Sequence, residues 1–200
     1  VVMMFVAGTS PKWLLAGAAA AAVFVVIYIS FMGYAGDRVT AWLHPEQDPG
    51  DTGYQILQSL YAIGSGGLFG LGFGKSRQKY LYLPFQYNDY IFAICCEELG
   101  LIGALAIIAL FCVTILRGYW IALHAVDRFS TVLAAGIVTL IAVQTILNLC
   151  VVTNLLPSTG IALPFFSYGG TALAVNLGEM GIVLQISRFR NHRKLQEEPL

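Results

Sequence analysis

The sequence predicts an all-α integral membrane protein: a polytopic helical bundle with a large ordered extracytoplasmic loop that contains short amphipathic helices. Three observations support this fold class. Of the 200 residues, 58% are hydrophobic and 11% are charged, whereas about a quarter of the residues of soluble globular domains are charged. Four apolar runs are each long enough to cross a bilayer as a helix, which takes roughly 20 residues. Lysine and arginine in the short connections lie on one side of these runs, as they do in membrane proteins.

The apolar runs divide the chain, which we expect to be one membrane domain, into helical spans. Within their apolar stretches the only charged residues are Glu97, Glu98 and Glu179. The four cysteines also lie in these runs without metal-binding spacing, so we expect them to be buried packing residues. The predicted segments are the end of a preceding span at 1–8, spans at 13–35, 89–117, 129–156 and 171–188, a large outer loop at 36–88, an outer turn at 157–170 and a tail at 189–200.

The basic residues determine the predicted orientation. Arg117 and Arg128 flank one connection, and the tail at 189–200 carries further basic residues. Because lysine and arginine are enriched in cytoplasmic connections, we expect the C-terminus in the cytoplasm and the loop 36–88 and the turn 157–170 outside. The formal net charge is zero, so no basic surface favours a nucleic acid as partner.

The outer loop at 36–88 is far longer than a median connection of about 4 to 6 residues. Tyr54, Leu57 and Tyr61 recur in it at helical spacing. This spacing predicts an amphipathic helix that lies on the membrane surface and packs on the spans. Arg38, near the start of the loop, is expected to pair with its acidic neighbour for structural reasons.

The segment 66–76, with the sequence GGLFGLGFGKS, ends like a phosphate-binding loop. It does not match one, because the pattern GxxxxGK[ST] requires a glycine where Phe69 stands. Two interpretations remain. The glycines form a tight turn packed between helices and the nearby cations are solvated, or Lys75, Arg77 and Lys79 bind a phosphate or pyrophosphate on a lipid.

Asp89 follows these cations at the outer end of the span 89–117. It is either a helix cap or a general base that takes a proton from an attacking hydroxyl. Glu97 and Glu98 lie one to two turns deeper, where carboxylates are costly and face a cavity or a partner. The uncharged turn 157–170, which is rich in proline and glycine, is expected to help build an outward-facing pocket.

Five motifs follow one another along the chain: GYQI at 53–56 with QS at 58–59, AIGSGGLFG at 62–70, DYIFA at 89–93, EELGLIG at 97–103 and TGIALPFFSYGG at 159–170. Together they resemble the SEDS family, the FtsW/RodA/SpoVE proteins of bacterial division, shape and sporulation, and the FtsW/SpoVE branch in particular. Members usually have ten spans, so the resemblance implies that this chain corresponds to the C-terminal half.

The resemblance implies a peptidoglycan glycosyltransferase that polymerises lipid II into β-1,4 glycan strands at the outer face of the bacterial cytoplasmic membrane, for cell division or sporulation. The family's essential aspartate, in the motif D-[FY]-I-F, falls on Asp89, the expected catalytic base. The chain departs from the family's common Pro-Glu and His-Thr at 84–85 and 87–88. A class B penicillin-binding protein transpeptidase is the implied partner, and Mg²⁺ or Mn²⁺ the suggested cofactor, without a ligand cluster in the sequence. The expected substrate-binding residues are Gln58, Ser59, Lys75, Arg77, Lys79, Glu97, Glu98, Ser167 and Tyr168.

Two other functions remain open. Glu97, Glu98 and Glu179 would suit a flippase that moves lipid II across the membrane, although the spans show no inverted repeat of the kind that transporters have. A non-catalytic divisome scaffold would recruit the transpeptidase and would need no carboxylate at the mouth of a pocket. Substitution of Asp89 separates these functions, because only the polymerase requires a base there.

Overall fold

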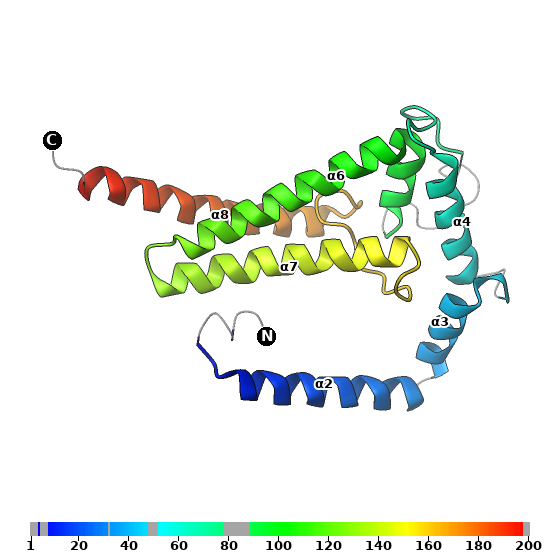
Figure 1. Cartoon of the computed structure of the whole chain (residues 1–200), viewed down its shortest axis with the longest axis horizontal. Helices are drawn as coiled ribbons and strands as arrows, with labels where there is room; N and C mark the ends of the chain where they lie inside the picture. Colours follow the sequence, from blue (N-terminus) through cyan, green and yellow to red (C-terminus); the bar gives the residue numbers. More distant parts are fainter. Residues whose placement is uncertain (1–3, 5–7, 32, 48–51, 78–88, 198–200) are drawn as a thin grey trace.

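The computed structural model (Figure 1) describes residues 4, 8–31, 33–47, 52–77 and 89–197 of the chain. The elements of these residues are all helical: α2 (Pro11–Phe31), α3 (Gly33–Leu43), the 3₁₀ helix η1 (Pro45–Gln47), α4 (Thr52–Ser65), α6 (Ile91–Leu123), α7 (Arg128–Val152) and α8 (Gly170–Glu197). Helices α6 and α7 are long and apolar enough to cross a membrane, and α2 has a shorter apolar stretch at Pro11–Phe24.

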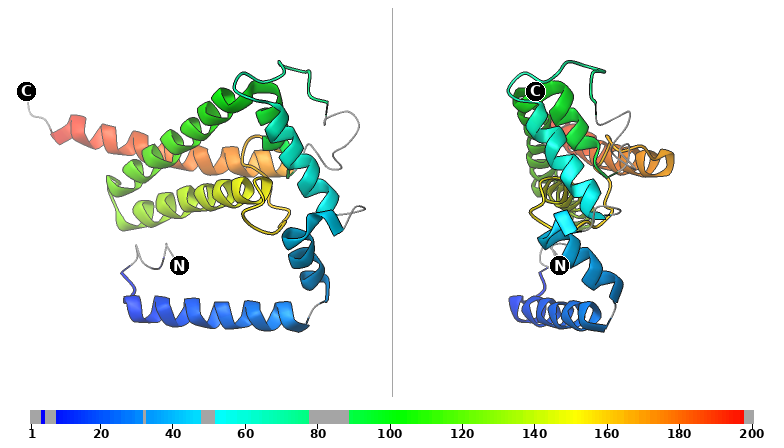
Figure 2. Two further views of the ribbon diagram at one scale, coloured as in Figure 1. Left: turned by 45° about the vertical axis from the view of Figure 1, so that its right-hand side comes forward. Right: turned by 90° about the vertical axis from the view of Figure 1, so that its right-hand side faces the viewer.

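Helices α6, α7 and α8 form the packed part of the molecule. Figure 1 shows α6 and α7 side by side and antiparallel, with α8 packed on both. The turn between α6 and α7 ends at Asp127, whose carboxylate accepts hydrogen bonds from the backbone N–H of Ser130 at 2.9 Å and from its hydroxyl at 2.7 Å. Helix α4 stands across one end of α6, and α3 leads from it to α2, which lies apart from the other long helices (Figure 2).

The span expected at 13–35 differs from the helix observed there. Helix α2 ends at Phe31, and the separate helix α3 begins at Gly33. The apolar run stops at this point, because the α3 sequence GYAGDRVTAWL mixes glycines and charges with apolar residues. The segment expected as an outer loop at 36–88 therefore begins inside α3 and also contains η1 and α4.

The last helix is longer than the span expected at 171–188. Helix α8 continues to Glu197, since residues 188–197 contain neither the glycine nor the proline that would disfavour a helix. The tail expected to follow the span is thus mostly a continuation of the same helix. Of the preceding span expected at 1–8, only residues 4 and 8 are described.

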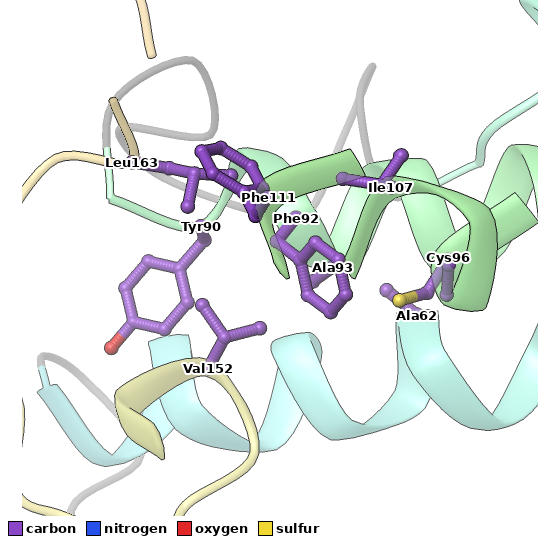
Figure 3. Close-up of a cluster of buried hydrophobic side chains, with 10 residues drawn as sticks. Ala62, Tyr90, Phe92, Ala93, Cys96, Ile107, Phe111, Val152 and Leu163 are labelled. Atoms are coloured by element: carbon purple, nitrogen blue, oxygen red, sulfur yellow. The ribbon is translucent and has the colours of Figure 1, made fainter. Parts of the chain in front are cut away.

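The two larger clusters of buried side chains in the described part of the chain hold the helices together. The first lies where the start of α6 meets α4, the end of α7 and the turn after α7. Figure 3 shows Cys96 of α6 beside Ala62 of α4, and Tyr90 beside Val152. The second joins the other end of α6 and α7 to α8. The first cluster consists of Ala62, Tyr90, Phe92, Ala93, Cys96, Ala104, Ile107, Phe111, Val152 and Leu163, and the second of Ile121, Ile137, Val138, Ile141 and Val183.

Helix α4 packs on α6 through one face. Ile56, Ser59 and Ala62 are buried on it, whereas Tyr61 is 59% exposed. The helix predicted from the spacing of its aromatic residues is therefore present and packed on the bundle. Its contact with α6 is made by the face of small and aliphatic residues next to the tyrosines.

Candidate active site

Asp89 lies immediately before α6 and is held by its backbone. The side-chain Nδ2 of Asn148 donates to the carbonyl oxygen of Asp89 at 2.7 Å and to that of Ile161 at 2.8 Å. Asn148 is on α7 and is 1% exposed. Because a side-chain amide nitrogen carries two hydrogens, both are used here. One residue of α7 thus fixes the start of α6 and the outer turn in relation to each other.

The carboxyl group of Asp89 lies against the outer turn and close to a cation. A Cβ atom added to Gly160 would be 3.6 Å from Oδ2 of Asp89. Arg38 reaches the same turn from α3, where its Nη1 donates to the carbonyl oxygen of Ser158 at 2.9 Å. Segments far apart in sequence, namely α3, the start of α6 and the outer turn, therefore meet at Asp89.

The electrostatic surroundings of Asp89 favour its protonated form more than water does. Burial raises the pKa of the Asp89 carboxyl above its ordinary value, and the positive charge of Arg38 opposes this rise in part. The neighbouring Tyr90 also has a raised pKa because of burial, while its hydrogen bond to Ser158 acts in the opposite direction. A carboxylate with a raised pKa binds a proton more tightly and is a stronger base.

A separate cavity of about 330 Å³ lies between α7, the outer turn and α8. Ser167 and Glu179 line it, but Asp89 does not. The hydroxyl of Ser167 accepts a hydrogen bond from the Leu163 N–H at 2.7 Å, and Tyr168 is 82% exposed. The turn 157–170 thus borders a cavity, and this cavity is distinct from the surroundings of Asp89.

The glycine-rich segment 66–76 packs on a break in α6. Gly100 interrupts this helix with φ 67° and ψ −169°, a conformation that is accessible to glycine and strained for other residues. The segment comes so close that a Cβ on Gly70 would lie 2.1 Å from the carbonyl oxygen of Glu98. This arrangement favours the first of the two interpretations, a tight turn packed between helices, for the glycines themselves.

Backbone hydrogen bonds join the two sides of the break to the segment. A helix end leaves carbonyl and N–H groups without partners in the helix. Before the break, the carbonyls of Glu97 and Glu98 accept from the N–H groups of Leu71 at 2.9 Å and Gly72 at 3.0 Å. After the break, the N–H groups of Leu101 and Ile102 donate to the carbonyls of Gly67 at 2.9 Å and Leu68 at 3.3 Å.

The carboxylate of Glu97 contacts the same segment. It accepts hydrogen bonds from the hydroxyl of Ser76 and from the backbone N–H of Arg77, the latter at 2.9 Å. Glu97 is 1% exposed and Ser76 is 2% exposed. Glu98 is also buried, and its Oε1 has no hydrogen-bond partner among the described residues.

The predicted substrate-binding residues are thus in different places. Lys75 and Arg77 are exposed on the segment that contacts Glu97. Glu97 follows Asp89 by eight residues, or about 12 Å at the rise of an α-helix. Lys79 lies outside the described residues. Ser59 is fully buried and its hydroxyl donates to the carbonyl of Val152 at 2.9 Å. Gln58, on the same helix, is partly exposed.

Sequence reasoning missed two residues at this site. The first is Asn148, which carries no charge, although an uncharged amide in an apolar helix is itself a signal of a hydrogen bond between helices. Arg38 was expected to pair with its acidic neighbour in sequence. The side chain of that neighbour lies outside the described residues, so the pairing stays a prediction. The charge of Arg38 acts on Asp89, and this contact across the chain has no signal in the local sequence.

The described residues do not provide a site for Mg²⁺ or Mn²⁺. Within the described ranges, no three His, Cys, Asp or Glu side chains gather where they could hold a metal ion. The charged neighbour of Asp89 is Arg38, a cation that repels a divalent ion.

Comparisons with known proteins identify relatives over nearly the whole chain. The chain is 47% identical over 193 residues to stage V sporulation protein E of Bacillus subtilis, covering 96% of this chain and 52% of that protein. It is 45% identical over 187 residues to the probable peptidoglycan glycosyltransferase FtsW of Geobacter sulfurreducens, covering 94% and 50%. It thus spans about half the length of the curated relatives it matches.

Solved structures agree with these sequence matches. A structure described as "Structural coordination of polymerization and crosslinking by a peptidoglycan synthase complex" superposes with a TM-score of 0.76 at 28% identity, over 94% of this chain and 52% of the other. A mutant of the rod shape determining protein RodA from Thermus thermophilus superposes with a TM-score of 0.52 at 31% identity, over 66% and 40%. The profile of the FtsW/RodA/SpoVE cell cycle proteins matches residues 1–192. The chain therefore belongs to the FtsW/RodA/SpoVE family, as its motifs predict.

Proposed function

We propose that this chain carries the catalytic base of a peptidoglycan glycosyltransferase that polymerises lipid II into β-1,4 glycan strands, for cell division or sporulation. The observation that supports this most directly is the setting of Asp89, a partly buried carboxyl with a raised pKa, next to Arg38 and held through its backbone by Asn148. The name of a relative at 45% identity, a probable peptidoglycan glycosyltransferase, points to the same reaction.

The proposed reaction is a single displacement. Asp89 takes the proton of the 4-hydroxyl of the GlcNAc unit of an acceptor lipid II. The oxygen attacks the anomeric carbon of the MurNAc unit of the donor, and the bond from that carbon to undecaprenyl pyrophosphate breaks, with the electron pair leaving on the pyrophosphate. One displacement inverts the α-linked donor to a β-1,4 bond. The raised pKa of Asp89 suits this role, because a base is most effective when its pKa is near the working pH.

Cations stabilise the charge that develops on the leaving group. Groups placed where charge develops usually make the largest contribution to catalysis. Arg38 is the described cation whose charge acts on Asp89, so we assign it to the reacting centre. Lys75 and Arg77 are exposed on the segment that contacts Glu97, and we assign them, with Lys79, to the pyrophosphate.

The family and the apolar helices support a location in the bacterial cytoplasmic membrane. In this proposal α6 and α7 cross the membrane, the C-terminus is cytoplasmic and Asp89 faces outward, where the basic connections predict it. The structural relative is a peptidoglycan synthase complex that couples polymerisation to crosslinking. This supports a class B penicillin-binding protein transpeptidase as the partner.

A flippase is the second candidate, and one observation favours it. Glu179 of α8 lines the cavity between α7, the outer turn and α8, and its Oε2 is buried without a hydrogen-bond partner in the described part of the chain. Ionisable groups within apolar helices mark transport paths in many membrane proteins. The cavity does not include Asp89, so the two functions depend on different residues.

The test is lipid II polymerisation by the full-length protein in detergent with its partner transpeptidase. Asp89→Asn keeps the size of the side chain and removes the base, so we expect loss of glycan strands with lipid II binding retained. Asp127→Asn is the matched control, because Asp127 caps the far end of α7 and should leave polymerisation unchanged. Unchanged polymer in Asp89→Asn would refute the assignment of the base. Absence of polymer from the wild type, with lipid II transport in vesicles, would favour the flippase.

A further inference from the structure

Glu97 is a buried charge within α6 whose contacts account for its position. A buried carboxylate is unfavourable unless hydrogen bonds compensate for the lost water. One oxygen of Glu97 accepts from the hydroxyl of Ser76, and the other accepts from the N–H of Arg77. Since Glu97 is 1% exposed, little of it is left to contact a substrate directly.

These contacts fix one short stretch of chain, the segment 75–77. Ser76 is itself 2% exposed, so its side chain is enclosed together with that of Glu97. The residues on both sides of it, Lys75 and Arg77, are exposed. Burial therefore alternates along these three residues, with the middle side chain enclosed and its neighbours exposed. Glu97 therefore binds the inward side of a segment whose outward side carries two cations.

The backbone of α6 at Glu97 and Glu98 also binds residues that precede the segment 75–77. The carbonyl groups of Glu97 and Glu98 accept hydrogen bonds from the N–H groups of Leu71 and Gly72. The main chain of the helix thus fixes residues 71–72, and the side chain of Glu97 fixes residues 76–77. The first stretch of α6 also begins directly after Asp89, so it connects the base to the basic segment.

We propose that Glu97 is a positioning residue, which holds the segment 75–77 on α6 and so sets where Lys75 and Arg77 meet the pyrophosphate of the lipid donor. This inference rests on the proposed function and changes the role of one residue in it. Glu97 acts through the backbone and hydroxyl of other residues and does not bind the substrate. Its loss should weaken the binding of lipid II, because pyrophosphate carries its charge before as well as during the reaction.

The experiment uses the full-length protein with Asp89→Asn, which allows lipid II to bind without turnover. Glu97→Gln removes the charge and one of the two accepting oxygens, and Ser76→Ala removes the hydroxyl that donates to Glu97. The double variant tests whether the two groups act together. We expect each single variant to weaken lipid II binding about tenfold, since the loss of a hydrogen bond to a charged group changes an equilibrium constant by about that factor or more. The double variant should bind lipid II as tightly as whichever single variant binds it less tightly.

Ser65→Ala is the matched control. Ser65 is a serine near the same segment whose hydroxyl donates to the carbonyl of Ala62 within α4 at 3.0 Å, and its loss should leave binding unchanged. With Asp89 present, the effect of Glu97→Gln should be mainly on KM for lipid II and less on kcat. Melting temperatures of all variants identify loss of fold, and Ser76→Ala, which removes one hydroxyl, tests the contact even where Glu97→Gln unfolds.

The outcomes separate this inference from the proposed function. If Ser76→Ala and Glu97→Gln bind lipid II as tightly as Ser65→Ala does, and polymerisation still requires Asp89, the positioning role alone is overturned. Additive losses in the double variant would also overturn it, because the two groups would then act independently. Polymerisation that survives Asp89→Asn would refute the assignment of the base, whatever the binding results.

Discussion

Replacement of Asn148 by leucine should remove the hydrogen bond that ties the backbone of Asp89 to α7. Leucine has the same number and branching of non-hydrogen side-chain atoms as asparagine but no hydrogen-bond donors. The change leaves the carbonyl groups of Asp89 and Ile161 without the bonds of 2.7 Å and 2.8 Å that the asparagine supplies. Because Asn148 is 1% exposed, water does not readily take its place. The start of α6 and the outer turn would then no longer be tied to α7 at this point.

The size of the effect follows from the two lost bonds. An unsatisfied buried polar group costs about 1 to 3 kcal/mol. Both carbonyls are only partly buried in these contacts, so we take the lower end, about 1 kcal/mol each and about 2 kcal/mol together. A transition state that is destabilised by the full amount, about 2 kcal/mol, gives a roughly 30-fold fall in kcat/KM.

The assay is lipid II polymerisation by the full-length protein, with kcat/KM measured for the wild type and for Asn148→Leu. Thr145→Val is the matched control on the same helix. Thr145 is buried and polar, but its hydroxyl donates to the carbonyl of Ile141 within α7 at 2.8 Å, and it ties no other segment to the helix. An Asn148→Leu protein as active as Thr145→Val would refute the reasoning, since the two carbonyls would then need no support from α7.

Two further predictions concern the charge beside the base and the glycine-rich segment. The charge of Arg38 lowers the pKa of Asp89. Arg38→Gln should therefore raise that pKa and move the acid limb of the pH profile of kcat/KM to higher pH, whereas Arg38→Lys should move it less. An unchanged acid limb in Arg38→Gln would contradict this. Gly70→Ala should lower the melting temperature of the full-length protein, because φ is +77° and the new Cβ would lie 2.1 Å from the carbonyl oxygen of Glu98. Gly64→Ala, where the Cβ meets nothing within 4 Å, should not, and equal melting temperatures would count against the packing described.

The sequence predicts the helices well where one physical signal dominates. The apolar runs that became α6 and α7 are long and nearly free of charge, and α4 follows from helical spacing. The limit of α2 at Phe31 was predicted less well, because an apolar run and a helix need not end at the same residue. Asp89 could be singled out as a carboxylate at the start of an apolar helix.

The remainder of the site depends on contacts between distant residues. Asn148 and Arg38 meet the Asp89 region across 59 and 120 residues of sequence, the latter through Ser158. An amide in an apolar helix signals a hydrogen bond to another segment, but no local pattern says which residues are its partners. The glycine-rich segment shows the same limit, since its glycines and cations were compatible with a packed turn and with lipid binding alike. Only the break at Gly100, which the segment covers, explains why the glycines are needed.

In the proposed membrane location, the break in α6 also changes which part of this helix is matched to a bilayer. With 33 residues, the helix would be about 50 Å long if it were straight, well beyond a hydrocarbon layer of about 30 Å. Residues 101–123 alone measure about 35 Å and suffice to cross it. The stretch before Gly100, with both glutamates, can then lie in the headgroup region at an angle of its own. Glu97 and Glu98 would in that case never enter the hydrocarbon, and the thickness of the membrane would place no constraint on the base that precedes them.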